Sequence, residues 1–100
     1  MATTSKALFR GAAATSSTTL YTVPASTTTV VTNIVVTNTA GSAGTFSLLL
    51  DDVSIATTVT VGAYDSTIID MKQVLATTKT IKGLASATTI NFHISGVEIA

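Results

Sequence analysis

The sequence predicts an all-β protein, an antiparallel β-sandwich or jelly-roll-like domain with about 7–9 short strands. Three observations favour this class. β-branched residues crowd every segment, apolar residues alternate with polar ones at a period of two, and turn residues recur about every 8–12 positions. Helix-forming residues are sparse, and the best helical candidate, Asp70–Leu75, is too short to form a stable helix alone.

The alternation is clearest in Thr45–Leu50, where Phe46, Leu48 and Leu50 fall on one face. Seven other segments carry the same strand signals. In chain order, the eight predicted strands are Lys6–Arg10, Thr18–Val23, Thr27–Asn38, Thr45–Leu50, Val53–Val61, Tyr64–Met71, Lys79–Leu84 and Thr88–Ile99.

The third predicted strand, Thr27–Asn38, is long enough to bend or to serve two sheets. Simple alternation places Val30, Ile34 and Val36 on one of its faces and Val31 on the other. The last strand changes phase, because its apolar residues occupy even-numbered positions early in the strand and odd-numbered positions after Gly96. A β-bulge at Gly96 would realign that apolar face.

Two turns have distinct chemistry. Asp51 and Asp52 separate two apolar runs and predict a tight hairpin. The run Thr39–Gly44 is rich in Gly, Ser and Ala, and its two glycines are expected to supply positive φ angles.

At 100 residues the chain is expected to form one folded unit. Residues 1–17 are predicted to be a flexible N-terminal arm or a short edge strand, and residues 18–100 a single β-sandwich domain. The N-terminal segment lacks an apolar run behind a basic start, which predicts no secretory signal. No stretch approaches the roughly 20 apolar residues that span a bilayer, so no membrane association is expected.

The composition narrows the function classes. Charged residues make up 10% of the chain and the formal net charge is zero, with no basic stripe that would bind nucleic acid. Cysteine is absent and there is one histidine, which rules out disulfides and a Cys/His zinc site. Thr and Ser supply about a third of the residues, a composition that suits strand surfaces packed against other chains. Association with partner chains is therefore the expected source of extra stability.

Few residues are candidates for chemistry. His93 could act as a base, but its mid-strand position favours a polar residue on the wet or partner-facing side of a strand. Asp51 and Asp52, with Asp65 and Asp70 further on, could bind Ca²⁺ or act as acid and base, yet no calcium-loop motif is present and turn chemistry explains the adjacent pair better.

The aromatic residues give little support to a sugar site. Tyr21 and Tyr64 are the only tyrosines, Trp is absent, and each tyrosine is expected at the edge of the core with its hydroxyl in water. We therefore expect no catalytic, cofactor-binding or metal-binding residues, no cofactor and no enzymatic activity.

Two segments near the start, Leu20–Ala25 (LYTVPA) and Val30–Asn38 (VVTNIVVTN), resemble the opening of a family of small structural proteins of tailed-bacteriophage virions. The close is similar too, with Ala85-Ser86 followed by Ile90–Ile99 (INFHISGVEI). The resemblance covers most of the chain from Leu20 onward. It implies a non-enzymatic virion component that is assembled in the host cytoplasm, and the family brings no functional residues with it.

Three functions follow as hypotheses. The first is a capsid decoration or cement protein, a trimer or dimer that bridges major capsid subunits. The second is a tail-tip, baseplate or fibre-associated structural component, whose partners would be tail proteins. The third, from a different class, is a host-surface glycan-binding module that uses Tyr21 or Tyr64.

Overall fold

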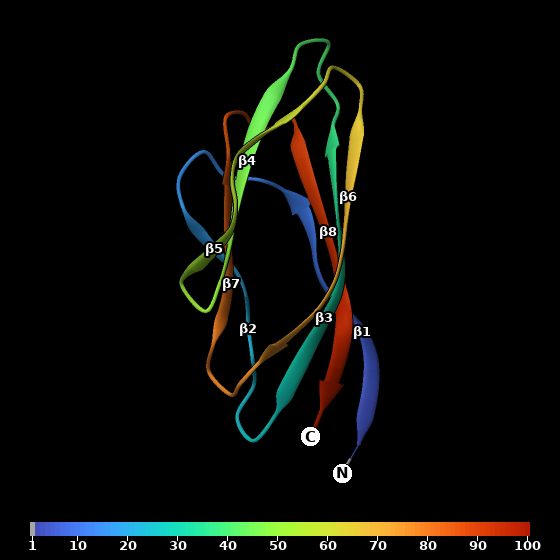
Figure 1. Cartoon of the computed structure of the whole chain (residues 1–100), viewed down its shortest axis with the longest axis vertical. Coiled ribbons are helices and arrows are strands. Elements are labelled where there is room, and N and C mark those ends of the chain that lie inside the picture. Colours follow the sequence, from blue (N-terminus) through green and yellow to red (C-terminus); the bar gives the residue numbers. More distant parts are fainter. Residues whose placement is uncertain (1) are drawn as a thin grey trace.

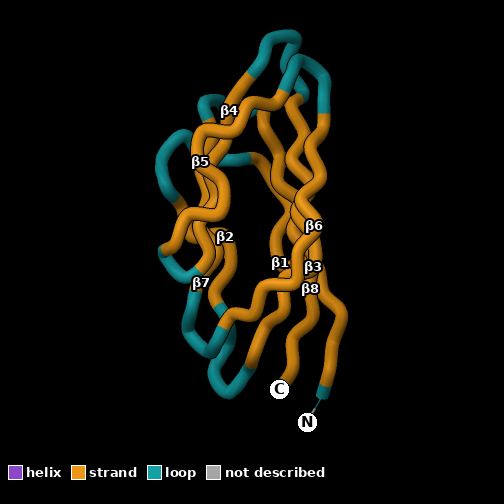
Figure 2. The backbone as a smooth tube through the Cα atoms, in the orientation of Figure 1, coloured by secondary structure: helices purple, strands orange, loops and turns teal. Residues whose placement is uncertain are grey.

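The computed structural model describes residues 2–100 as two four-stranded antiparallel sheets that face each other (Figures 1 and 2). The strand order is β1-β8-β3-β6 in one sheet and β2-β7-β4-β5 in the other, so the predicted all-β sandwich is confirmed. The strands are β1 (Thr3–Ala12), β2 (Thr18–Thr22), β3 (Thr28–Asn38), β4 (Gly44–Leu50), β5 (Val53–Val61), β6 (Ser66–Leu75), β7 (Thr80–Ala85) and β8 (Ile90–Ile99).

The pairing follows a simple rule. Each strand of the first half pairs with one of the second half: β1 with β8, β2 with β7, β3 with β6, and β4 with β5. The chain therefore behaves as one long hairpin, with its tip between β4 and β5, that is wrapped into two layers. Further pairs between β3 and β8 and between β4 and β7 complete the sheets. This winding is the jelly roll.

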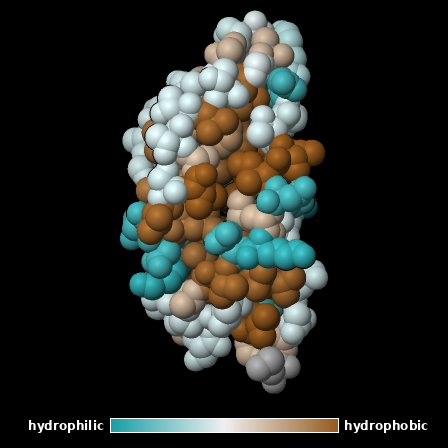
Figure 3. Space-filling view, in the orientation of Figure 1, coloured by the Kyte–Doolittle hydropathy of each residue, from teal (hydrophilic) through white to brown (hydrophobic). Residues whose placement is uncertain are grey.

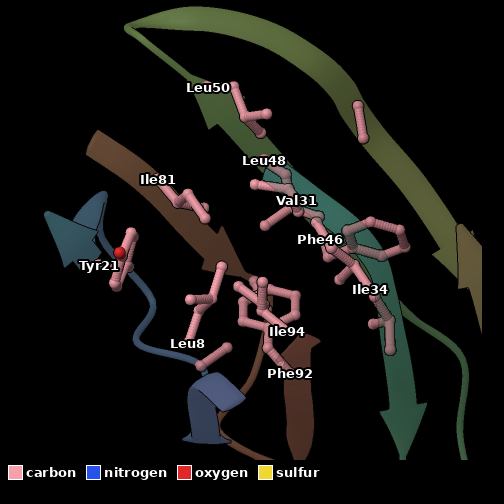
Figure 4. Packing of buried hydrophobic residues seen from close by; sticks show 14 of the residues in the cluster. Leu8, Tyr21, Val31, Ile34, Phe46, Leu48, Leu50, Ile81, Phe92 and Ile94 are labelled. Atoms are coloured by element: carbon pink, nitrogen blue, oxygen red, sulfur yellow. The ribbon is translucent and has the colours of Figure 1, made fainter. Parts of the chain in front are cut away.

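The core lies between the two inner faces, because alternate residues of each strand point inward. Figure 4 shows side chains of both sheets converging there, including Ile34, Phe46 and Phe92. The rings of Phe46 and Phe92 meet edge to face, with centroids 6.1 Å apart and an interplanar angle of 73°. This contact joins β4 of one sheet to β8 of the other, so burial of the two rings holds the layers together.

The N-terminal segment is part of the sandwich. β1 pairs with β8 from Thr3 opposite Ile99 to Ala12 opposite Asn91, and it forms an edge of its sheet. Leu8 on this strand is buried in the core. Within residues 1–17 the structure has β1 over Thr3–Ala12, while Met1 lies outside the described residues.

The simple alternation expected for β3 is wrong at its start. Val31 is fully buried with Ile34 and Val36, whereas Val30 is partly exposed on the outer face. The phase changes at Thr32, where the register of β3 shifts against both β6 and β8. A bulge allows one long strand to keep apolar residues inward on both sides of the irregularity.

The β-bulge predicted at Gly96 of β8 is also wrong, because the irregular residues lie on the two neighbouring strands. The register shifts beside β8 arise near Leu8 of β1 and Thr32 of β3, and Val97 pairs with Val30 on the outer face. Gly96 itself has a packing role, because a Cβ atom there would lie 2.4 Å from the carbonyl oxygen of Val30. The odd-numbered apolar residues at the end of the chain therefore cover the outside of the sheet.

The turn glycines do not have the expected geometry either. No described glycine has a positive φ, and such angles belong instead to non-glycine residues. Gly41 and Gly44 provide space: a Cβ at Gly41 would lie 3.1 Å from the hydroxyl of Tyr64, and one at Gly44 would lie 2.8 Å from the Cδ1 of Ile90. Close approach of neighbouring side chains therefore explains these glycines.

The Asp51-Asp52 hairpin is confirmed. Leu50 pairs with Val53, and the two residues between them have φ angles of 53° and 60°. A two-residue turn with positive φ at both positions is of type I′, which favours Asn-Gly because other residues are strained there.

We expect Asp52→Gly to unfold about 4–8 °C above Asp52→Ala, since only glycine relieves the positive φ at this position. Both variants lose the same contact between Asp52 and Lys82, so their difference isolates the backbone effect. Thermal unfolding followed by circular dichroism measures it. Equal midpoints for the two variants would show that the turn does not constrain this residue.

Candidate interaction surface

The residues considered for chemistry do not come together. His93 is exposed on the outer face of β8, between Arg10 of β1 and Val35 of β3 in the sheet register. Asp51 and Asp52 lie at the β4–β5 turn, whereas Asp70 is on β6. Within residues 2–100 no group of three or more His, Cys, Asp or Glu residues could hold a metal ion.

Two lysines face the acidic turn, Lys82 on β7 and Lys79 in the turn that precedes β7. The Nζ of Lys82 lies 2.7 Å from the Oδ1 of Asp52, and the Nζ of Lys79 lies 3.6 Å from the Oδ1 of Asp51. The hydrogen bond from Lys82 lowers the pKa of Asp52. Each aspartate thus faces a lysine, which supports the turn interpretation over a cation site.

A small hollow on the outer face of the β2-β7-β4-β5 sheet is rimmed by hydroxyl groups. Its volume is about 200 Å³, and Thr45, Ser47 and Ser86 are among the residues that line it. Two of these hydroxyls accept hydrogen bonds from backbone amides, Ser86 from Thr45 at 3.0 Å and Ser47 from Thr58 at 2.9 Å. The hydroxyls thus fix the backbone around the hollow, and the only aromatic side chain in its lining, Phe46, is buried.

Tyr21 has a structural role that the sequence did not indicate. Its hydroxyl donates a hydrogen bond of 2.5 Å to Glu98 Oε2 and lies 2.8 Å from the Oγ1 of Thr29, which then donates to it. The other oxygen of Glu98 lies 3.5 Å from Lys6 Nζ. This network joins β2 of one sheet to β1, β3 and β8 of the other, so the expectation of a hydroxyl in water is wrong for Tyr21.

Burial of the Tyr21 ring, together with its hydrogen bond to Glu98, raises the pKa of Tyr21 from 10.0 to about 12. A group whose pKa is higher in the folded state contributes stability that is full below pH 10.0 and is lost as the pH rises through about 12.

We therefore expect Tyr21→Phe to lower the free energy of unfolding by about 1–3 kcal/mol at pH 7, since it leaves the buried Thr29 hydroxyl without its partner. The deficit should shrink between pH 10 and pH 12. Urea unfolding at several pH values measures it, and phenolate absorbance in a Tyr64→Phe background reports Tyr21 alone. A deficit that stays constant over this range would contradict the assigned role.

The ring of Tyr64 does not lie at the edge of the core. It is 78% exposed at the connection between β5 and β6, with a φ of 55°. It is one of the exposed large apolar side chains on β5, on β6 and on the connection between these two strands, each of which forms an edge of its sheet. We name this surface the β5–β6 edge; its exposed side chains are Val53, Ile55, Tyr64, Ile68 and Val74.

The space-filling view shows apolar side chains gathered across the middle of the visible face, with hydrophilic ones between them (Figure 3). The apolar surface continues over the outside of the β1-β8-β3-β6 sheet. There, Val74 of β6 pairs with Val30 of β3, which pairs with Val97 of β8, and all three are at least partly exposed. The β5–β6 edge and this row share Val74, which connects them.

Comparison with known proteins adds little. No family model matches the sequence, and no curated protein is similar enough to count as a relative. Among solved structures, one described as "Crystal structure of Agl-KA catalytic domain" is similar over 90% of this chain, with 16% identity and a TM-score of 0.40. This chain covers 20% of that structure's length, and a similarity this weak carries no argument about function. Within residues 2–100 no helix is long and apolar enough to cross a membrane.

Proposed function

We propose that this chain is a non-enzymatic structural protein of a tailed-bacteriophage virion, and specifically a capsid decoration protein that bridges major capsid subunits. The observation that carries the proposal is the apolar surface formed by the β5–β6 edge and the row Val74, Val30 and Val97. Large exposed apolar patches are typical of surfaces that pack against other proteins.

Two further features support this function. The jelly roll is common among viral capsid proteins, although it also occurs in lectins and cupins, so it supports the proposal only by analogy of fold. The resemblance of Leu20–Ala25 and Val30–Asn38 to virion structural proteins points in the same direction. In the structure these segments lie in β2, in the connection after it and in β3, and the similar closing segment Ile90–Ile99 forms β8.

The test is quantitative mass spectrometry of purified virions, with this chain measured against the major capsid protein. A decoration protein repeats over the capsid lattice, and we expect hundreds of copies in each particle. A few to dozens of copies would favour a tail-tip, baseplate or fibre component instead. Absence from the particles would overturn both structural functions.

The glycan-binding alternative depends on one feature, the exposed ring of Tyr64. Tyr21 cannot serve it, because its hydroxyl is bonded to Glu98 within the protein. A glycan array probed with the wild-type chain and with Tyr64→Ala tests this function. Binding that the substitution abolishes would support a glycan module and count against a purely structural protein.

A further inference from the structure

The two open sides of the sandwich differ in chemistry. On one side β1 and β2 are the edge strands, and their exposed residues are mainly threonines with Lys6 and Arg10. No large apolar side chain is exposed there among the described residues. On the other side lies the β5–β6 edge. Charged side chains protect an edge strand from pairing with another chain. β1 carries Lys6 and Arg10 and β6 carries Asp70 and Lys72, whereas β2 and β5 carry no charged residue.

β6 has the features of a strand that can accept a partner. It contains ten residues, has no proline and has no positive φ angle. Ile69 and Met71 pack against the core, whereas Ile68, Asp70 and Lys72 point outward. On the β3 side the register of β6 shifts at Met71 and Lys72, between Gln73 opposite Val31 and Asp70 opposite Asn33. β3 occupies one side of β6, and the N–H and C=O groups of its other side remain free for a second ladder.

The outward residues of β6 are complementary to themselves in the antiparallel direction. Read along the strand they are Ile68, Asp70, Lys72 and Val74. If two copies of β6 pair with Met71 opposite Met71, Ile68 of each copy faces Val74 of the other. Asp70 of each copy then faces Lys72 of the other.

The charges in this row have no ion-pair partners in the monomer. The three ion pairs of the described residues use Lys6 with Glu98, Lys79 with Asp51, and Lys82 with Asp52. Asp70 and Lys72 are in none of them, although they lie on the same face of one strand. A second copy would give each of them a partner of opposite charge directly across the ladder.

We propose that the chain forms a two-fold dimer in which two β6 strands pair antiparallel about Met71, which joins two four-stranded sheets into one of eight strands. A two-fold axis perpendicular to this sheet also brings the two β5 strands toward each other, because β5 is the edge strand of the facing sheet and lies near β3, the neighbour of β6. Val53 and Ile55, both exposed on β5, then add apolar area to the same interface. This dimer does not depend on the particle in which the chain is found.

The proposal is tested by charge reversal and sedimentation velocity, at protein concentrations from about 1 μM to 1 mM. In the Asp70→Lys variant, the lysine introduced in each copy faces Lys72 of the other copy, on either side of the Met71 pair. We expect this repulsion to raise the dissociation constant of the dimer at least about tenfold. The double variant Asp70→Lys/Lys72→Asp exchanges the two charges and should restore the wild-type constant. Arg10→Asp, on the opposite edge of the same sheet, is the matched control and should leave it unchanged.

Amide hydrogen exchange supplies a second readout, since the ladder protects the free N–H groups of β6 only in the dimer. We expect slower exchange in β6 at high protein concentration and no change in β1. A wild-type chain that stays monomeric to about 1 mM overturns the proposal. The partner of the β5–β6 edge would then be a different protein. A dimer that tolerates Asp70→Lys, or one that the double exchange fails to restore, overturns the proposed pairing.

Discussion

Replacing Phe92 with alanine is expected to lower the free energy of unfolding by about 3–5 kcal/mol. The side chain is fully buried, and its ring contacts that of Phe46 on the opposite sheet. The substitution removes this contact and leaves a cavity between the layers at the centre of the core (Figure 4). A domain of 100 residues has a total stability of only about 5–15 kcal/mol, so the variant should be marginally folded.

Urea unfolding followed by circular dichroism measures this loss, with Phe92→Leu as the matched control. Leucine fills most of the space and should cost clearly less than alanine. A double-mutant cycle with Phe46→Leu then isolates the ring–ring contact, for which we expect a coupling of about 0.5–1.5 kcal/mol. A loss below about 1 kcal/mol for Phe92→Ala would contradict a tightly packed interface between the sheets.

The strands could be predicted from the sequence because each depends on local signals. All eight predicted segments overlap an observed strand, since the period-2 pattern and the turn residues are properties of neighbouring positions. The alternation of Phe46, Leu48 and Leu50 is observed as predicted, with all three buried. The Asp51-Asp52 turn was identified for the same reason.

The errors arise where a residue's environment is set by strands far away in the sequence. Val30 and Val31 are chemically identical, and only the bulge at Thr32 decides which of them faces the core. Gly96 resembles a bulge residue, but its role is the close approach of the Val30 backbone. No local pattern contains this information, because both features depend on which strands pair.

The same limit applies to the interaction surface. The exposure of Ile68 and Val74 follows from the position of β6 at the edge of a sheet, and edge positions are set by the strand order β1-β8-β3-β6. The sequence around Ile68 and Val74 is the same whether the strand lies at the edge of a sheet or in its centre, so it does not indicate their exposure. One signal was available, however: the order Ile68, Asp70, Lys72, Val74 is self-complementary in the antiparallel direction, and that can be recognised without coordinates.

Removal of residues 2–17 is expected to abolish cooperative unfolding, which would end the view of this segment as a detachable arm. The deletion removes β1 and with it the buried side chains of Leu8 and Ala13. It also removes backbone hydrogen bonds that tie the two sheets: the N–H of Ala13 donates to Ile90 on β8, and that of Ala85 on β7 donates to Ala14. The core would then be open along one side of the sandwich.

Thermal unfolding by circular dichroism and binding of a hydrophobic dye measure the result. We expect a broad transition and strong dye binding, whereas a shorter deletion of residues 2–5, which keeps Leu8, should unfold cooperatively. A sharp transition near the wild-type midpoint in the longer deletion would show that β1 is dispensable. Because the deletion disturbs folding and docking together, any role of this edge in attachment to a particle is better tested by charge reversal at Arg10, whose side chain is exposed.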